Sequence, residues 1–159
     1  MKLSVRGLTP EQKRIIHNIC YFICDKLEID RVRTRQIHVK ILKLKDAEGQ
    51  TWTFENVIYV EVDKDCLRWP SKFFEILTHE LVHARQYING DFHYVRNKEH
   101  WKGSLISAQH NLFENVINLP TREYKNLPWE KEAYRVSRLM LTKHARRFII
   151  DWKKTVKRS

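Results

Sequence analysis

Hydrophobic residues recur with helical spacing near the start of the chain. Thr9-Pro10-Glu11 has the features of a helix start, because Thr can cap the first turn, Pro fits the first helical position and Glu suits the first turn. Apolar residues then follow at intervals of three and four, namely Ile15, Ile16, Ile19, Cys20, Ile23 and Leu27. This spacing predicts an N-terminal helix that ends near Leu27.

The next part of the chain alternates between apolar and polar positions. Ile37, Val39 and Ile41 alternate with His38 and Lys40, which is typical of a strand with one face in solvent. A turn is predicted at residues 46–50, and residues 51–54 and 56–62 have the composition of two further strands. Together these segments predict a small antiparallel three-stranded sheet.

Helical patterns return after the strands. Residues 73–87 form a mostly apolar run that predicts a buried helix, with Ser71 as its cap and Gly90 as its stop. Residues 91–103 are polar and irregular, and a helix is predicted over residues 104–117. Pro128 suits the first turn of a long helix that ends near Trp152. The order of helices and strands predicts an α+β fold, with the sheet packed on helices.

The buried helix carries the sequence His79-Glu80-Leu81-Val82-His83. Residues four apart lie on one face of a helix, so His79 and His83 can bind one metal ion together. Glu80 can reach a water molecule on that metal. Two imidazoles and a carboxylate are the components of a zinc hydrolase, with Zn2+ as cofactor and Glu80 as catalytic base. The alternative is two core histidines that share this spacing by chance.

Length and composition fit a single cytoplasmic domain. A chain of 159 residues with 42% hydrophobic residues can bury a sizeable core. Three cysteines without regular spacing argue against a disulfide framework, and Cys20 and Cys24 are interpreted as small buried residues rather than as metal ligands beside His17. No apolar stretch is long enough to span a membrane, and a signal-peptide core is lacking, which predicts a cytoplasmic protein.

Positive charge is concentrated at the two ends of the chain. The formal net charge is +11, yet residues 51–100, which contain the histidine motif, carry net −2, and residues 143–159 carry net +6. This distribution favours an acidic partner, either nucleic acid or an acidic protein surface, and its alternative is a solvated face. We expect one domain over residues 1–142 and a basic C-terminal helix end and tail over residues 143–159.

A catalytic zinc site needs a third protein ligand from further along the chain. The arrangement H-E-x-x-H-x-x-G-x-x-H is excluded, because Gln86 and Asn89 stand where it needs Gly and His. The downstream candidates are His93, His100, His110, Glu114, Glu123, Glu130 and Glu132. Glu130 is favoured, since the small Ala133 lets its helix pack closely against the metal helix. Glu132 is a rival that points about 200° away on the same helix.

The segments around these residues resemble the gluzincins, zinc peptidases in which a second helix supplies a glutamate ligand. With Trp101-Lys102-Gly103 and Pro128-Trp129-Glu130-Lys131-Glu132-Ala133-Tyr134, the chain looks like a group of small phage and bacterial metallopeptidases, over about residues 57–141. The resemblance implies a minimal zincin-like domain that hydrolyses peptide bonds, with zinc on His79, His83 and Glu130. It also implies that the strand at residues 57–62 forms the rim of the cleft.

The sequence departs from the gluzincin pattern at Tyr134, where those enzymes usually have an Asp that steadies a ligand histidine. Tyr134, Tyr124 and His100 are candidates for the donor that stabilises the oxyanion. A third ligand at His100 would instead resemble the DNA-associated proteases of the Spartan type. The remaining alternative is a non-catalytic module with a structural or vestigial zinc site, in which the basic and aromatic residues 143–158 bind nucleic acid.

Overall fold

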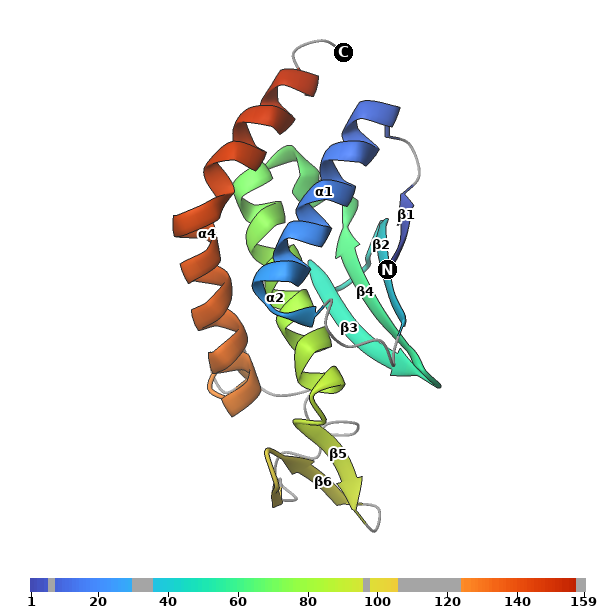
Figure 1. Ribbon diagram of the computed structural model, residues 1–159, viewed down its shortest axis with the longest axis vertical. Coiled ribbons are helices and arrows are strands. Elements are labelled where there is room, and N and C mark those ends of the chain that lie inside the picture. The colour runs from blue at the N-terminus through green and yellow to red at the C-terminus, as the bar shows by residue number, and fades with distance from the viewer. Residues whose placement is uncertain (6–7, 30–35, 96–97, 106–123, 157–159) are drawn as a thin grey trace.

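The computed structural model describes residues 1–5, 8–29, 36–95, 98–105 and 124–156, which form helices packed on one face of a mixed sheet (Figure 1). The long helices of this described part are α1 (Pro10–Lys26), α2 (Pro70–Ile88) and α4 (Pro128–Val156). The predicted α+β layout is confirmed. None of the helices in the described ranges is long and apolar enough to cross a membrane.

The main sheet has the strand order β1-β2-β4-β3, with β1 at Lys2–Val5, β2 at Gln36–Leu42, β3 at Gly49–Phe54 and β4 at Val57–Asp63. The three predicted strands are all present. The prediction that they form an antiparallel three-stranded sheet is wrong, because β2 pairs in parallel with both β1 and β4, and only β3 and β4 are antiparallel. Alternation shows which side of a strand is buried, but it carries no signal for the order of the strands. After β2 the chain forms β3 at the edge of the sheet, and β4 then pairs between β2 and β3.

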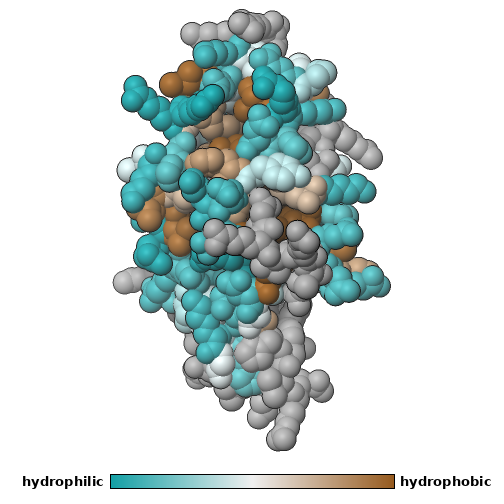
Figure 2. All heavy atoms as spheres, viewed as in Figure 1, coloured by the Kyte–Doolittle hydropathy of each residue, from teal (hydrophilic) through white to brown (hydrophobic). Residues whose placement is uncertain are grey.

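Apolar faces of the helices and the sheet meet in one core. The buried residues of α1 are those predicted from its spacing, and Thr9 caps the helix in a reciprocal pair with Gln12, at 3.2 Å from the Gln12 amide nitrogen to Thr9 Oγ1. Val39 of β2, Val60 of β4 and Phe74 of α2 are fully buried in the same core. On the face shown in Figure 2, hydrophobic residues appear as separate clusters among hydrophilic ones.

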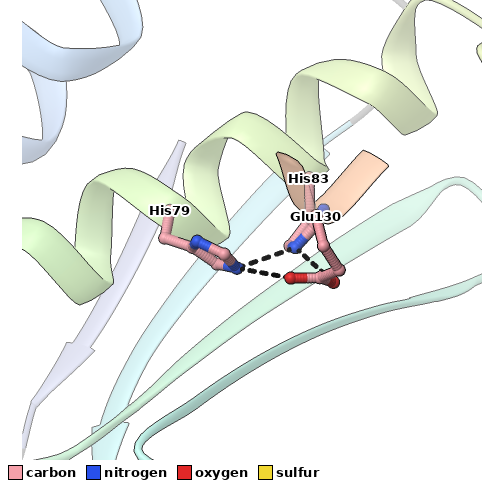
Figure 3. A group of neighbouring side chains, drawn as sticks. All are labelled: His79, His83 and Glu130. Carbon is pink, nitrogen blue, oxygen red and sulfur yellow. Dashed lines mark hydrogen bonds and ion pairs between the residues drawn. The ribbon is translucent and has the colours of Figure 1, made fainter. Parts of the chain in front are cut away.

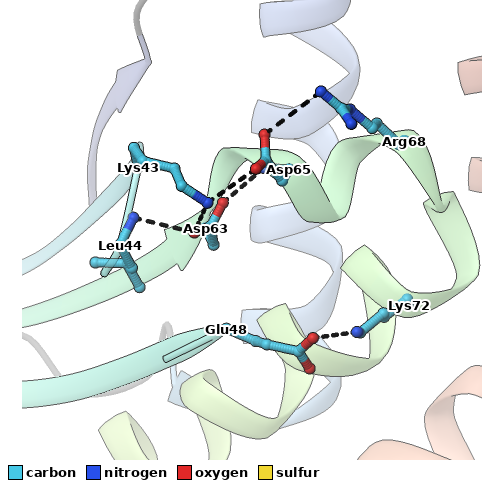
Figure 4. Close-up of polar contacts among 7 residues, drawn as sticks. All are labelled: Lys43, Leu44, Glu48, Asp63, Asp65, Arg68 and Lys72. Carbon is cyan, nitrogen blue, oxygen red and sulfur yellow. Dashed lines mark hydrogen bonds and ion pairs between the residues drawn. The ribbon is translucent and has the colours of Figure 1, made fainter. Parts of the chain in front are cut away.

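A polar network links the sheet to the start of α2 (Figure 4). The carboxylate of Asp63 accepts hydrogen bonds from the amide of Leu44 (3.1 Å), from Lys43 Nζ (3.0 Å) and from the amide of Asp65 (2.7 Å). Asp63 thereby caps the short 3-10 helix η2 (Lys64–Arg68) that leads into α2. Lys72 of α2 also pairs with Glu48, which precedes β3. These contacts join the N-terminal end of α2 to the loop between β2 and β3.

The ends of α2 differ in part from the prediction. Ser71 is not the cap, since the helix begins at Pro70 and its N-cap residue, Trp69, makes no side-chain hydrogen bond. Gly90 follows the end of the helix with a φ of +72°, a left-handed conformation that suits glycine and confirms it as the stop.

A second, smaller sheet follows α2. It consists of β5 (Phe92–Val95), β6 (Lys98–Trp101) and β7 (Ser104–Leu105), paired in antiparallel order. Residues 91–103, predicted to be irregular, therefore contain a hairpin. The helix predicted over residues 104–117 is replaced by β7 at its first two residues, and the rest of that prediction lies outside the described residues.

Helix α4 continues through residue 143 without a break and ends at Val156. Phe148 and Trp152 belong to the main core, and the indole nitrogen of Trp152 donates a hydrogen bond to the carbonyl of Leu67 at 3.1 Å. The boundary expected at residue 143 thus falls inside a helix whose last turns pack on the domain. The exposed cations of this segment lie on the side of α4 away from the core.

Candidate metal centre

Two helices bring three metal-ligating side chains to one point (Figure 3). His79 and His83 lie one turn apart on α2, and Glu130 lies in the first turn of α4. The helices approach closely there, and Ala133, one turn beyond Glu130, is fully buried. The structure thus brings together the three residues predicted as ligands, His79, His83 and Glu130, as a group that could hold a metal ion.

The two histidine nitrogens lie close to each other, and each lies close to a different oxygen of Glu130, at separations near those around a small tetrahedral ion. His79 Nε2 lies 3.1 Å from His83 Nε2 and 3.1 Å from Glu130 Oε2, and His83 Nε2 lies 3.2 Å from Glu130 Oε1. An ion with tetrahedral bonds of about 2.0 Å separates its ligand atoms by about 3.3 Å. Glu130 Oε2 is buried yet forms no hydrogen bond of acceptable geometry within the described part of the chain, so a cation would supply a partner.

Without a metal, the site is held by an ion pair. Burial alone would raise the pKa of Glu130, but its close polar contacts with His79 and His83 outweigh burial and hold this pKa at about 2. Burial alone would lower the pKa of His83, but Glu130 raises it to about 9. At neutral pH the His83 imidazolium is therefore paired with the Glu130 carboxylate, and a metal ion must displace one proton to bind.

Gln86 selects the ring nitrogen of His83 that faces the site. The Gln86 amide nitrogen donates to Glu132 Oε2 (3.0 Å) and to the Trp129 carbonyl (3.2 Å), so its oxygen must be the atom 2.8 Å from His83 Nδ1. Nδ1 consequently keeps its proton, and deprotonation leaves Nε2 with a free lone pair beside Glu130. Gln86 is fully buried. Its contact with Nδ1 holds the His83 ring so that Nε2 faces Glu130.

Glu80 borders a pocket of about 190 Å³ that His83 and Glu130 also line. The hydroxyl of Thr51 lies 2.8 Å from Glu80 Oε2 and 3.0 Å from the Glu80 carbonyl oxygen. Burial raises the pKa of Glu80, against the attraction of the two histidines. A buried carboxylate with a raised pKa beside a metal site is suited to accept and return a proton.

Strand β3 forms the other wall of this pocket. Gly49, Gln50 and Thr51 line it, and β3 is the edge strand of the main sheet beside the site. The expectation that residues 57–62 form the rim of the cleft is wrong, because they form β4, which lies between β2 and β3. Gly49 lets the backbone approach closely, since a Cβ atom there would lie 2.7 Å from Glu80 Oε1.

Two tyrosines lie near the ligands. The ring of Tyr134 lies 4.5 Å from the ring of His79, and burial raises the pKa of its phenol. Tyr124 lines the pocket with Glu130, and burial and that carboxylate raise the pKa of its phenol. Both phenols stay protonated at neutral pH and can donate a hydrogen bond. The geometry favours Tyr124 as a hydrogen-bond donor inside the pocket and Tyr134 as a donor beside His79.

Two of the other predicted ligands, Glu132 and His100, lie in the described part of the chain but outside the group. Glu132 instead forms ion pairs with Arg85 (3.2 Å) and Lys102 (3.3 Å), besides its bond from Gln86. His100 lies on β6, and the backbone of His93 lies on β5. The remaining candidates, His110, Glu114 and Glu123, lie outside the described residues.

The sequence reasoning assigned no role to Gln86, Thr51 or Gly49. Gln86 had a signal, because a polar residue three positions after His83 falls on the buried face of the helix. Thr51 and Gly49 had none, since their partner Glu80 lies about thirty residues further along the chain. Only the placement of β3 against α2 brings them to the site.

Comparison with known protein families, with curated proteins and with solved structures finds no match to this chain. The resemblance to gluzincins therefore stays a prediction. What the structure defines is a class of site: two histidines from an H-E-x-x-H helix and a glutamate from a second helix, grouped as a metal ion would require.

Proposed function

We propose that the protein is a zinc-dependent peptidase in which His79, His83 and Glu130 hold the ion and Glu80 acts as general base. One observation carries this proposal: the three ligand atoms converge within 4.8 Å of one another, beside a pocket that Glu80 lines. The edge strand β3 on the same pocket supports a peptide as substrate, because an extended chain can pair with a free strand edge.

Zinc fits the donor set better than the alternatives. Two imidazole nitrogens and one carboxylate oxygen are common ligands of catalytic zinc, whereas magnesium and calcium prefer oxygen ligands alone. The histidine nitrogens lie 3.1 Å apart and each lies 3.1–3.2 Å from one oxygen of Glu130, which is compatible with a four-coordinate ion whose fourth position is left to water.

When bound, zinc would supply an activated water and polarise the scissile carbonyl. Glu80 accepts a proton from the attacking water and passes it to the leaving amine. Thr51 limits the motion of the Glu80 carboxylate through its contact at 2.8 Å. The phenol of Tyr124 or Tyr134 donates a hydrogen bond to the developing oxyanion. Gln86 keeps the His83 ring in its ligating orientation.

The alternative of a non-catalytic nucleic-acid module draws less support from the structure. That hypothesis rested on basic residues mixed with aromatic ones over residues 143–158. Phe148 and Trp152, two aromatic residues of this segment, are buried in the core, so their rings are not available to stack on bases.

Metal content and activity test the proposal separately. Mass spectrometry of folded wild type should find close to one zinc per chain, which His83→Ala and Glu130→Ala lose and the neighbouring Glu132→Ala keeps. Glu80→Gln should keep zinc and lose hydrolysis of fluorescently labelled casein, while Glu55→Gln, a change at an exposed turn, should leave hydrolysis intact. A Glu80→Gln protein that cleaves at the wild-type rate would remove Glu80 from the mechanism.

A further inference from the structure

A groove of about 750 Å³ on α4 is lined by positive charge. Its five cationic residues are Lys125, Lys131, Arg135, Arg138 and Lys143, and no acidic residue lines it within the described part of the chain. Lys131, Arg135 and Arg138 follow one another at intervals of four and three, so they form a stripe along one face of the helix.

Within the described part of the chain, most of this charge has no acidic partner. Among the described residues, Arg138 alone of the five has an acidic partner, Glu75 at 4.0 Å. Two cations nearer the end of α4 differ, because Asp151 lies 3.8 Å from Arg147 and 3.5 Å from Lys154. Unpaired cations collected in one groove attract an anionic ligand more strongly than the same charges scattered over a surface.

One residue of the groove, Tyr134, contacts the candidate metal centre. The ring of Tyr134 lies 4.5 Å from the ring of the ligand His79. Lys125 Nζ lies 5.5 Å from the centre of the same tyrosine ring. From Tyr134 to Lys143 the helix rises by about 14 Å, which an extended peptide covers in about four residues.

We infer that the groove binds Asp or Glu side chains of the substrate within about four residues of the scissile bond, on one side of it. This inference rests on the proposed peptidase function and adds the substrate class, an acidic polypeptide segment. A peptide is favoured over nucleic acid because Tyr134 lines the groove and also contacts the ligand His79, so a chain bound in the groove lies close to the site proposed for amide hydrolysis. The aliphatic side chain of Leu139, which is 47% exposed on the groove, also offers a contact for a peptide side chain.

Binding can be measured without hydrolysis in zinc-loaded, full-length Glu80→Gln protein. The probes are fluorescent ten-residue peptides with glutamates on the N-terminal half, glutamates on the C-terminal half, or glutamines throughout. One glutamate peptide should bind at least about tenfold more tightly than the glutamine peptide at low salt, and should lose most of that advantage near 0.5 M salt, where the Debye length falls to about 4 Å.

Two double variants locate the effect. Lys131→Glu with Arg135→Glu should weaken binding of the glutamate peptide about tenfold, because two attractions become repulsions. Arg146→Glu with Lys153→Glu makes the same change in net charge at exposed positions of α4 outside the groove, and should change affinity about twofold or less. Circular dichroism confirms that both variants fold.

Equal binding of glutamate and glutamine peptides would overturn the inference, as would equal losses in the two double variants. If a single-stranded DNA oligonucleotide binds the wild-type groove but not the Lys131→Glu, Arg135→Glu variant, and the glutamate peptides do not bind, the inference is overturned in favour of nucleic acid. If the wild-type protein hydrolyses casein but the Glu80→Gln protein shows no preference for acidic peptides, only the inference about the groove is refuted and the peptidase function stands. Absence of all hydrolysis, with the peptide preference retained, refutes the peptidase function and keeps the acidic-peptide site.

Discussion

Replacement of Gln86 tests whether a ligand must be oriented before zinc can bind. Gln86→Leu keeps a side chain of similar volume but removes the bond to His83 Nδ1 and the bonds to Trp129 and Glu132. The imidazole of His83 then loses the acceptor that keeps Nε2 free for the metal. Loss of such an orienting partner typically costs about 10–100-fold in metal affinity.

The same change should also lower stability. A net contribution of about 1 kcal/mol for each of the three buried hydrogen bonds predicts a loss of about 3 kcal/mol in the free energy of unfolding. Glu132 keeps its ion pairs with Arg85 and Lys102, so its carboxylate is not left without partners. Urea unfolding of the metal-free protein measures this loss independently of zinc.

Zinc affinity is measured by competition with a chromophoric chelator. Gln50→Leu is the matched control, because Gln50 lines the same pocket but bonds to Glu61, at 2.6 Å, and to none of the ligands. It should change the zinc Kd by about twofold or less, well below the 10–100-fold expected for an orienting residue. A folded Gln86→Leu protein whose zinc affinity equals that of the control would refute the role assigned to Gln86.

Three further predictions follow from the geometry. Gly49→Ala should lower kcat/KM about tenfold or more with zinc content unchanged, because the new Cβ atom would lie 2.7 Å from Glu80 Oε1 and would displace that carboxylate. An unchanged rate in a steady-state peptidase assay would contradict this. The pKa of His83 is about 9 in the metal-free site, so zinc must displace its proton at neutral pH. The affinity for zinc should therefore fall as pH falls from 9 to 6. Calorimetry in buffers of different ionisation enthalpy should detect about one proton released per zinc near pH 7. Phe148→Ala should lower the free energy of unfolding by about 3–5 kcal/mol in urea titrations, because the ring packs in the core. Arg146→Ala, at an exposed position, should change this free energy by less than about 0.5 kcal/mol. Equal effects of the two changes would exclude the last turns of α4 from the core.

Several features of the site could be predicted because they depend on residues close together in the chain. His79 and His83 share a helix face through the period of the helix alone, and Glu80 follows from the same motif. Glu130 was reached from its place near the start of a helix, from the small Ala133 after it and from the resemblance to gluzincins. The structure brings Glu130 to the histidines and separates its rival Glu132, which turns toward Arg85 and Lys102 instead.

The order of the sheet was beyond such reasoning. The strands β2, β3 and β4 were predicted from alternation and composition, but hydrogen bonds between strands are made by backbone groups that are alike in every residue. The insertion of β4 between β2 and β3 makes β3 the edge strand, and so decides which strand borders the pocket. The rim that the resemblance to gluzincins implied at residues 57–62 lies one strand earlier in the chain, at β3.

By itself, the sequence determined the three long helices, the strands β2, β3 and β4, and the two histidines that one helical turn brings together, because periodicity and spacing act over a few residues. Only the tertiary structure decided what meets across elements. It joined Gln86 to His83 and Glu132, brought Thr51 and Gly49 against Glu80, and collected the cations of α4 into one groove beside Tyr134. These relations depend on how α2, α4 and β3 pack, and packing is set by the shape and burial of whole faces rather than by any local pattern.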